Sequence, residues 1–139
     1  MSVLVDTSVW SLALRRRRAS PEPAATELGF LIRDGLASLI GPIRQELLSG
    51  VPSDQQFQIL REHLRPFPDL PVEMHDYEEA AAFFNRCRSK GVQGSNTDFL
   101  ICAVSVRYQA PILTTDEDFI HFARVLPIQL HSPRKHGAG

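Results

Sequence analysis

The chain has 139 residues, 43% of them hydrophobic, which is enough apolar material for one buried core and the usual size of one domain. Fifteen Lys and Arg residues oppose sixteen Asp and Glu residues, so net charge indicates neither a strongly basic nucleic-acid binder nor an acidic disordered protein. The sequence has no signal-peptide layout and no apolar stretch of membrane length. We therefore expect a cytoplasmic protein that does not enter a membrane.

The amino-terminal part of the chain predicts a strand, two helices and a second strand. Residues 3–5 are all apolar, as in a strand buried on both faces, and Asp6-Thr7-Ser8 then supplies residues that start a helix. A basic run of four arginines interrupts the pattern, after which apolar residues recur at helical spacing up to Asp34-Gly35. The second strand is predicted over residues 38–40. The basic run consists of Arg15, Arg16, Arg17 and Arg18.

The rest of the chain alternates helices with extended segments. Further helices are predicted over residues 41–48, 53–65, 76–89 and 97–108. Residues 66–72 contain three prolines, which restrict this segment to an edge strand or an extended link. Residues 111–115 predict a last strand, and Asp116 then opens another helix.

This alternation predicts an α/β protein with three layers, in which helices flank a mainly parallel central sheet. We expect residues 1–130 to form a single domain and the polar residues 131–139 to form a flexible tail. Cys87 and Cys102 fall in predicted helices and lack the spacing of a zinc site, so we expect two buried, reduced thiols.

Four carboxylates fall where they can meet at one edge of this sheet. Asp6 and Asp116 each follow a short strand, and ligands of open parallel sheets bind beyond the carboxyl ends of the strands. Glu46 lies one turn into the helix after another strand, and Asp98 lies in the first turn of its helix, so both can reach the same edge. Like charges held close together call for a cation, and oxygen ligands favour Mg²⁺ or Mn²⁺.

Each acid also has an ordinary structural explanation. Asp6, Asp98 and Asp116 lie where a carboxylate caps a helix or complements its dipole, and Glu46 alone is typical of a solvent-facing helix residue. Their joint placement favours a site, because short polar residues that can orient a ligand accompany each aspartate. These residues are Thr7 and Ser8, Ser95 and Asn96, and Thr114 and Thr115.

Four segments resemble, in order and spacing, the motifs of PIN-domain ribonucleases, in particular VapC-like toxins. The segments are VLVDTSVW, IGPIRQELLSG, QGSNTDFLICAVSVRY and PILTTDEDF, and the resemblance spans nearly the whole chain. Carried over to this sequence, the acidic metal ligands of the family fall on Asp6, Glu46, Asp98 and Asp116. The resemblance therefore implies the same four-carboxylate site that the placement of these residues after the predicted strands and in the predicted helices indicates.

Other residues match the family less directly. Ser8 and Asn96 occupy positions that often carry small polar residues near the acids, and we interpret both as supporting residues. Asp118 either assists the acids or is an exposed acid in the first turn of a helix. The basic run lies close to where the RNA and antitoxin surfaces of the family meet, so it is either a phosphate contact or a solvated loop. The candidate contacts are Arg15, Arg16, Arg17 and Arg18.

The resemblance implies a metal-dependent endoribonuclease that is the toxin of a bacterial toxin–antitoxin pair. In such an enzyme, one or two Mg²⁺ or Mn²⁺ ions bind the scissile phosphate and lower the pKa of an attacking water. The implied partners are an RNA substrate, a small antitoxin whose carboxyl-terminal segment covers the active site, and a second copy of the chain in a homodimer. His63, His75 and His121 show no paired spacing and are interpreted as ordinary histidines.

Three alternatives compete with this interpretation. A phosphotransferase of the haloacid-dehalogenase type has a second aspartate two residues after the first, where this chain has Ser8. A dinucleotide-binding domain needs a glycine-rich first turn, which DTSVW lacks. A non-catalytic PIN scaffold that binds protein or RNA is the remaining alternative, and the complete set of acids argues against it.

Overall fold

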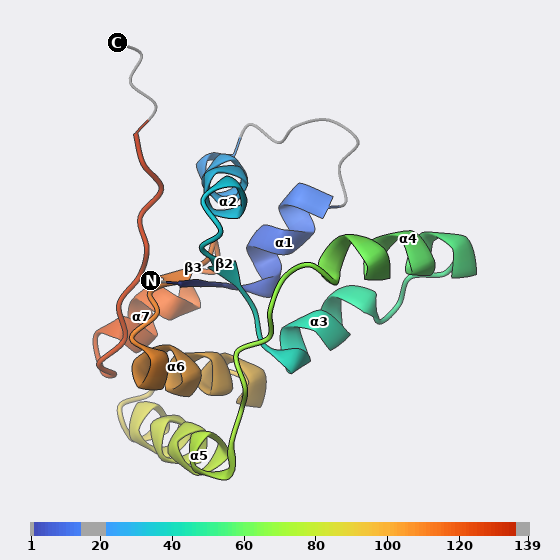
Figure 1. Ribbon diagram of the computed structural model, residues 1–139. Helices are drawn as coiled ribbons and strands as arrows, with labels where there is room; N and C mark the ends of the chain where they lie inside the picture. The colour runs from blue at the N-terminus through green and yellow to red at the C-terminus, as the bar shows by residue number, and fades with distance from the viewer. Residues whose placement is uncertain (1, 15–21, 136–139) are drawn as a thin grey trace.

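The structure is a computed structural model, and it describes residues 2–14 and 22–135 of the chain. At its centre lies a parallel three-stranded sheet in the order β2-β1-β3 (Figure 1). The strands are β1 (Val3–Val5), β2 (Ala37–Ser38) and β3 (Ile112–Leu113). Leu4 of the central strand lies opposite Ser38 on one side and Ile112 on the other. Every residue of these strands is buried, as expected of short parallel strands covered on both faces.

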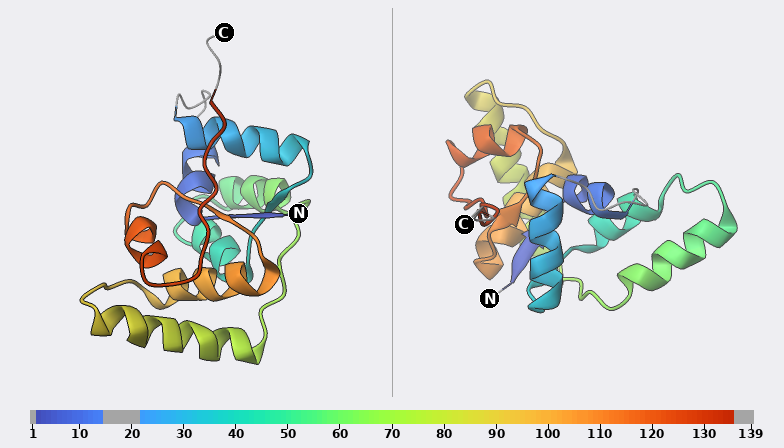
Figure 2. Two further views of the ribbon diagram at one scale, coloured as in Figure 1. Left: turned by 90° about the vertical axis from the view of Figure 1, so that its left-hand side faces the viewer. Right: turned by 90° about the horizontal axis from the view of Figure 1, so that it is seen from above.

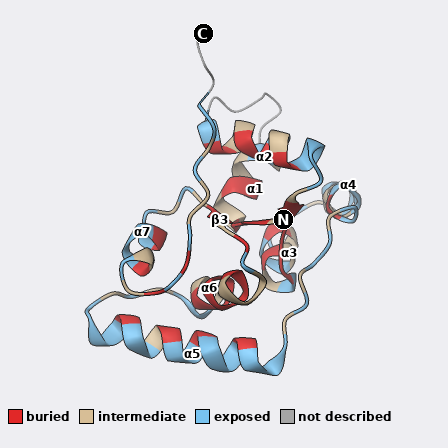
Figure 3. Ribbon diagram, turned by 60° about the vertical axis from the view of Figure 1, so that its left-hand side comes forward, coloured by how far each residue is buried: buried red, intermediate tan, exposed pale blue. Residues whose placement is uncertain are grey.

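Helices cover both faces of the sheet, which confirms the predicted α/β fold. They are α1 (Thr7–Leu14), α2 (Pro23–Arg33), α3 (Gly41–Leu48), α4 (Asp54–Leu64), α5 (Met74–Ser89), α6 (Asn96–Tyr108) and α7 (Asp118–Ala123). The pair α1 and α2 lies on one face, and α6 lies on the other with α5 packed on its outer side (Figures 1 and 3). The helices α3 and α4 form an arm that projects from the sheet (Figure 2).

The helix α6 forms much of the core on its side of the sheet. The seven consecutive residues from Phe99 to Ser105 are all buried, because α6 is apolar around its whole circumference and lies between the sheet and α5. Cys87 of α5 and Cys102 of α6 are free, buried thiols, as predicted. Among the residues that the structure describes, no helix combines the length and the apolar character needed to cross a membrane.

Several element boundaries differ by one or two residues from those predicted, among them the end of β2 and the start of α7. Strand β2 ends at Ser38, and Leu39 makes only a single bridge to Asp69, which identifies the proline-containing segment around Asp69 as an extended link. Helix α7 begins at Asp118 and not at Asp116. The reason is local, because the Asp116 carboxylate accepts a hydrogen bond from the backbone N–H of Asp118 (2.9 Å) and holds a turn in front of the helix.

Residues 129–135 contact the rest of the domain through backbone and side-chain hydrogen bonds, and the flexible tail expected over residues 131–139 stays a prediction. The segment runs beside β3, where the backbone N–H of Ile112 donates to Gln129 and the N–H of His131 donates to Ile112. It then crosses α2, where His131 and Arg134 bind the carboxylate of Glu27. A carboxylate with only 1% of its surface exposed requires such partners, and the polar sequence of the segment supplies them.

Candidate active site

The carboxyl ends of β1 and β3 bring Asp6 beside the segment that contains Asp116. Val5 pairs with Leu113 in the parallel register, so the residues that follow the two strands lie next to each other. The hydroxyl of Thr114 donates to Asp6 Oδ2 (2.8 Å) and accepts from the backbone N–H of Asp116 (3.0 Å). One threonine therefore connects the two acids.

Ser8 supports the same acid from the first turn of α1. Its hydroxyl donates to Asp6 Oδ2 (2.9 Å) and accepts from the backbone N–H of Thr115 (3.2 Å). Asp6 is almost fully buried, with 6% of its surface exposed. Burial raises the pKa of Asp6 despite the hydrogen bonds from Thr114 and Ser8, and the negative charge of Asp116 raises it further.

Asp98 is both a helix cap and a neighbour of the other acids. It forms a capping box with Ser95, in which Asp98 Oδ2 accepts from the Ser95 N–H and Ser95 Oγ accepts from the Asp98 N–H, both at 3.1 Å. Burial raises the pKa of Asp98, and the charges of Asp6 and Asp116 raise it too. The capping explanation is thus correct, and it does not exclude a place for Asp98 beside the other carboxylates.

The loop before α6 is packed so closely that position 94 has room only for glycine. A Cβ atom on Gly94 would lie 2.5 Å from a ring carbon of Phe122 and 3.1 Å from a ring carbon of Phe99. Both rings are buried and so have little freedom to move. This packing fixes the direction in which the chain enters α6, and with it the position of the Asp98 carboxylate.

Glu46 lies on the exposed side of α3 and is connected to Asp6 through the neighbouring residue. The hydroxyl of Thr7 donates to Glu46 Oε2 (3.1 Å), which holds the glutamate beside the start of α1. The side chains of Asn96 and Asp118 are exposed, and no hydrogen bond among the described residues joins either side chain to the acids. The supporting roles predicted for these two residues therefore stay predictions.

The basic run that was predicted to contact RNA or the antitoxin falls between the two described parts of the chain, residues 2–14 and 22–135. It follows the last residue of α1 directly and precedes α2. Its contact role consequently stays a prediction from the sequence. The residues that lie outside the described part are Arg15, Arg16, Arg17 and Arg18.

Comparisons with known proteins identify the family. A family model of the PIN domain matches residues 3–125. This chain belongs to the PIN domain family. The VapC ribonuclease Mb1587 of Mycobacterium bovis and the ribonuclease VapC11 of Mycobacterium tuberculosis are each 32% identical to it over 136 residues, which cover 95% of this chain and 99% of each relative.

Solved structures with low sequence identity show the same PIN fold. The structure of VapBC-1 from nontypeable Haemophilus influenzae matches with a TM-score of 0.74 at 16% identity, covering 97% of this chain and 100% of that one. The structure of VapBC2 from Rickettsia felis bound to a DNA fragment from their promoter matches with a TM-score of 0.73 at 17% identity, covering 94% and 98%. FitAcB from Neisseria gonorrhoeae matches with a TM-score of 0.72 at 21% identity, covering 94% and 97%.

The donor chemistry of this PIN domain suits a hard divalent cation. Asp6, Asp98 and Asp116 offer only oxygen ligands, and their mutual repulsion is relieved by positive charge. As the side chains stand, residues 2–14 and 22–135 contain no group of three or more His, Cys, Asp or Glu close enough together to hold a metal ion. The carboxylates would have to turn toward one another to coordinate one.

Proposed function

We propose that this PIN domain is an endoribonuclease that hydrolyses RNA phosphodiester bonds, with one or two Mg²⁺ or Mn²⁺ ions held by Asp6, Glu46, Asp98 and Asp116. The observation that carries the proposal is the juxtaposition of Asp6, Asp98 and Asp116 at the carboxyl edge of the sheet. The names of the curated relatives, both ribonucleases, support RNA as the substrate.

The residues around the acids prepare them for this role. Bound divalent ions supply charge neutralisation at the phosphate and a lower pKa for the attacking water. Ser8 and Thr114 orient Asp6, Ser95 orients Asp98, and Thr7 orients Glu46, each through a hydrogen bond to one carboxylate oxygen. Such contacts limit the rotation of the acids and reduce the reorganisation needed to bind a cation.

Binding of Mn²⁺ tests the proposal and separates it from the alternative of a non-catalytic scaffold. We expect millimolar Mn²⁺ to raise the melting temperature by several degrees over that in chelator, because the ion binds the folded state and relieves repulsion between the acids. Calorimetric titration should show binding heat that is lost in Asp116→Asn and kept in Asp54→Asn, whose acid lies in the first turn of α4. Equal melting temperatures together with no binding heat would favour the scaffold.

We also propose that the chain is the toxin of a toxin–antitoxin pair and binds a small antitoxin. A pocket of about 790 Å³ lies between α1, the end of α3 and α4, with apolar walls that include Leu14, Leu47 and the half-exposed Ile59. Leu47 directly follows Glu46, so a peptide in this pocket can direct an Arg or Lys toward Glu46 and Asp6.

Two further proposals come from the sequence alone. The first is that the chain forms a homodimer, and the second is that the basic run contacts RNA or the antitoxin. The proposed RNA or antitoxin contacts of the basic run are Arg15, Arg16, Arg17 and Arg18.

Co-purification from the native host tests the antitoxin proposal. We expect a small protein to accompany the wild-type chain and to suppress RNA cleavage, and Ile59→Glu to release it because a charge enters the apolar pocket. The control is Ile32→Glu on α2, which changes a similarly exposed isoleucine (41% against 49%) outside the pocket. A complex that cleaves RNA as fast as the free chain would contradict the toxin assignment but not the nuclease assignment.

A further inference from the structure

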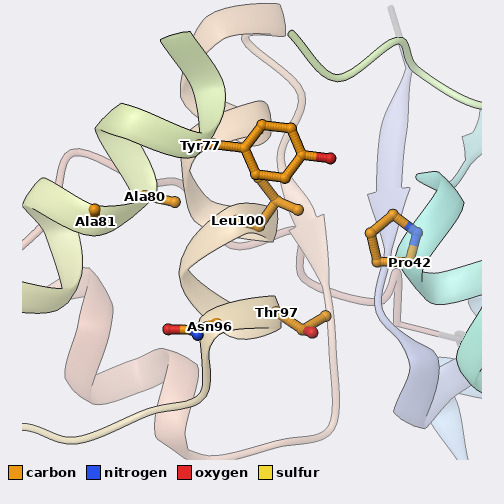
Figure 4. Close-up of a pocket in the computed structure, with 7 residues that line it drawn as sticks. All are labelled: Pro42, Tyr77, Ala80, Ala81, Asn96, Thr97 and Leu100. Atoms are coloured by element: carbon orange, nitrogen blue, oxygen red, sulfur yellow. The ribbon is translucent and has the colours of Figure 1, made fainter. Parts of the chain in front are cut away.

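An open pocket of about 450 Å³ lies between α5, the first turns of α6 and the start of α3. Figure 4 shows the ring of Tyr77 beside Leu100, with Ala80 and Ala81 continuing the α5 wall. Leu100 and Ala80 are buried, whereas the residue Tyr77 is 56% exposed. The pocket therefore combines an accessible aromatic ring with a floor of small and aliphatic side chains.

Polar side chains line the edge of this pocket around its apolar floor. Asn96 and Thr97 line the pocket from the first turn of α6, and the hydroxyl of Tyr77 points toward the side of Pro42 (Figure 4). The side chains of Tyr77, Asn96 and Thr97 have no hydrogen-bond partner within the described part of the chain. An amide and two hydroxyls are thus available to a ligand that also presents a flat apolar face.

Two elements connect the pocket to the proposed active site. On α6, Thr97 immediately precedes Asp98. On α3, Pro42 and Glu46 are four residues apart, so they lie on the same face of the helix in successive turns. The pocket consequently opens within one helical turn of two of the proposed metal ligands.

We propose that this pocket binds one unpaired RNA base next to the scissile phosphate, with the base stacked on Tyr77 and its polar edge facing Asn96 and Thr97. The inference rests on the proposed ribonuclease function and names the substrate class as single-stranded RNA. Bases splayed out of a single strand bind to proteins by stacking on aromatic rings and by hydrogen bonds to their edges, which are the two kinds of contact that this pocket offers. A paired base has neither its face nor its edge free.

Binding of a fluorescein-labelled single-stranded RNA of ten nucleotides in an Asp98→Asn background measures this contact without cleavage. We expect Tyr77→Ala and Ala81→Leu to raise the Kd about tenfold, the first by removing the stacking ring and the second by filling the pocket. Tyr77→Phe should keep most of the affinity because it keeps the ring. Met74→Ala and Ala82→Leu are the matched controls, since both alter exposed α5 residues outside the pocket and should leave the Kd unchanged.

Cleavage of a randomised RNA pool by the otherwise wild-type protein provides a second readout. We expect a base preference beside the cut that Tyr77→Ala and Ala81→Leu weaken and Ala82→Leu preserves. The proposal is overturned if wild type cleaves RNA but Ala81→Leu matches Ala82→Leu in both Kd and base preference. It is also overturned if Tyr77→Ala converts a dimer into a monomer in analytical ultracentrifugation, because a second copy then covers the pocket. If wild type neither binds nor cleaves RNA, the ribonuclease function itself fails.

Discussion

Replacement of Asp98 by asparagine is expected to reduce Mn²⁺-dependent RNA cleavage by about 100-fold or more, because it removes one negative ligand from the site. The capping box should survive, since the amide oxygen of asparagine can accept the hydrogen bond that Asp98 Oδ2 now receives from the Ser95 N–H. Initial rates on a labelled RNA, with Mn²⁺ and with chelator, measure the effect. Cleavage at the wild-type rate would remove Asp98 from the mechanism.

The same variant should be more stable than wild type when no metal is present. Burial and the neighbouring acids raise the pKa of Asp98, so the folded state loses stability as pH rises above the ordinary value of 3.8 and the group ionises. Asparagine carries no charge and escapes that loss, so its melting temperature in chelator at pH 7 should be higher. The control variant Asp54→Asn should change neither the cleavage rate nor the melting temperature, because Asp54 is an exposed acid in the first turn of α4, next to the cap residue Ser53.

Replacement of Glu27 by glutamine is expected to lower the free energy of unfolding at pH 7 by about 3 kcal/mol. Burial alone would raise the pKa of Glu27, but hydrogen bonds from Arg134 and His131 outweigh it and lower the pKa from 4.5 to about 2. The carboxylate therefore stabilises the fold fully above pH 4.5 and loses this contribution as pH falls toward 2. The difference in unfolding free energy between Glu27→Gln and wild type should shrink to roughly half at pH 3.

Urea unfolding at pH 7 and pH 3 measures the difference in unfolding free energy between Glu27→Gln and wild type at each pH. Asp34→Asn, at the end of the same helix, is the control, because Asp34 is 49% exposed and lies 4.0 Å from Arg134, where an ion pair contributes little. Its unfolding free energy should stay close to that of wild type. If Glu27→Gln behaves like Asp34→Asn, residues 131–135 do not hold α2 in solution, and the expectation of a flexible tail stands.

Local features of the sequence were sufficient to predict the elements that position the site. The apolar run Val3–Val5, followed directly by Asp6, predicts a buried strand whose carboxyl end carries an acid, and the structure contains that strand. The register was not predictable, because β2 and β3 have two residues each and a pattern that short does not select its partner. The contact between Thr114 and Asp6 depends on that register.

Polar contacts between distant segments were the part that the sequence did not reveal. The carboxylate of Glu27 is bound by His131 and Arg134, which lie 104 and 107 positions later in the chain. Each of these two residues alone looks like an ordinary polar residue. Asp76 is another example, because its buried carboxylate accepts two hydrogen bonds from Arg107 on the next helix. Composition and periodicity describe one segment at a time, so they cannot identify such partners.

The strand order delays assembly of the site until β3 has been synthesised. Strand β1 leaves the ribosome before β3, yet Asp6 receives its hydrogen bond from Thr114, 108 residues later, and β3 is itself flanked by the segment around Leu130. A nascent chain that ends before Thr114 contains Asp6, Glu46 and Asp98, but it lacks Asp116 and leaves an edge of β1 unpaired. Under the proposed function, a chain that ends before Thr114 is unable to cut RNA, and such truncated products are harmless to the cell that makes them.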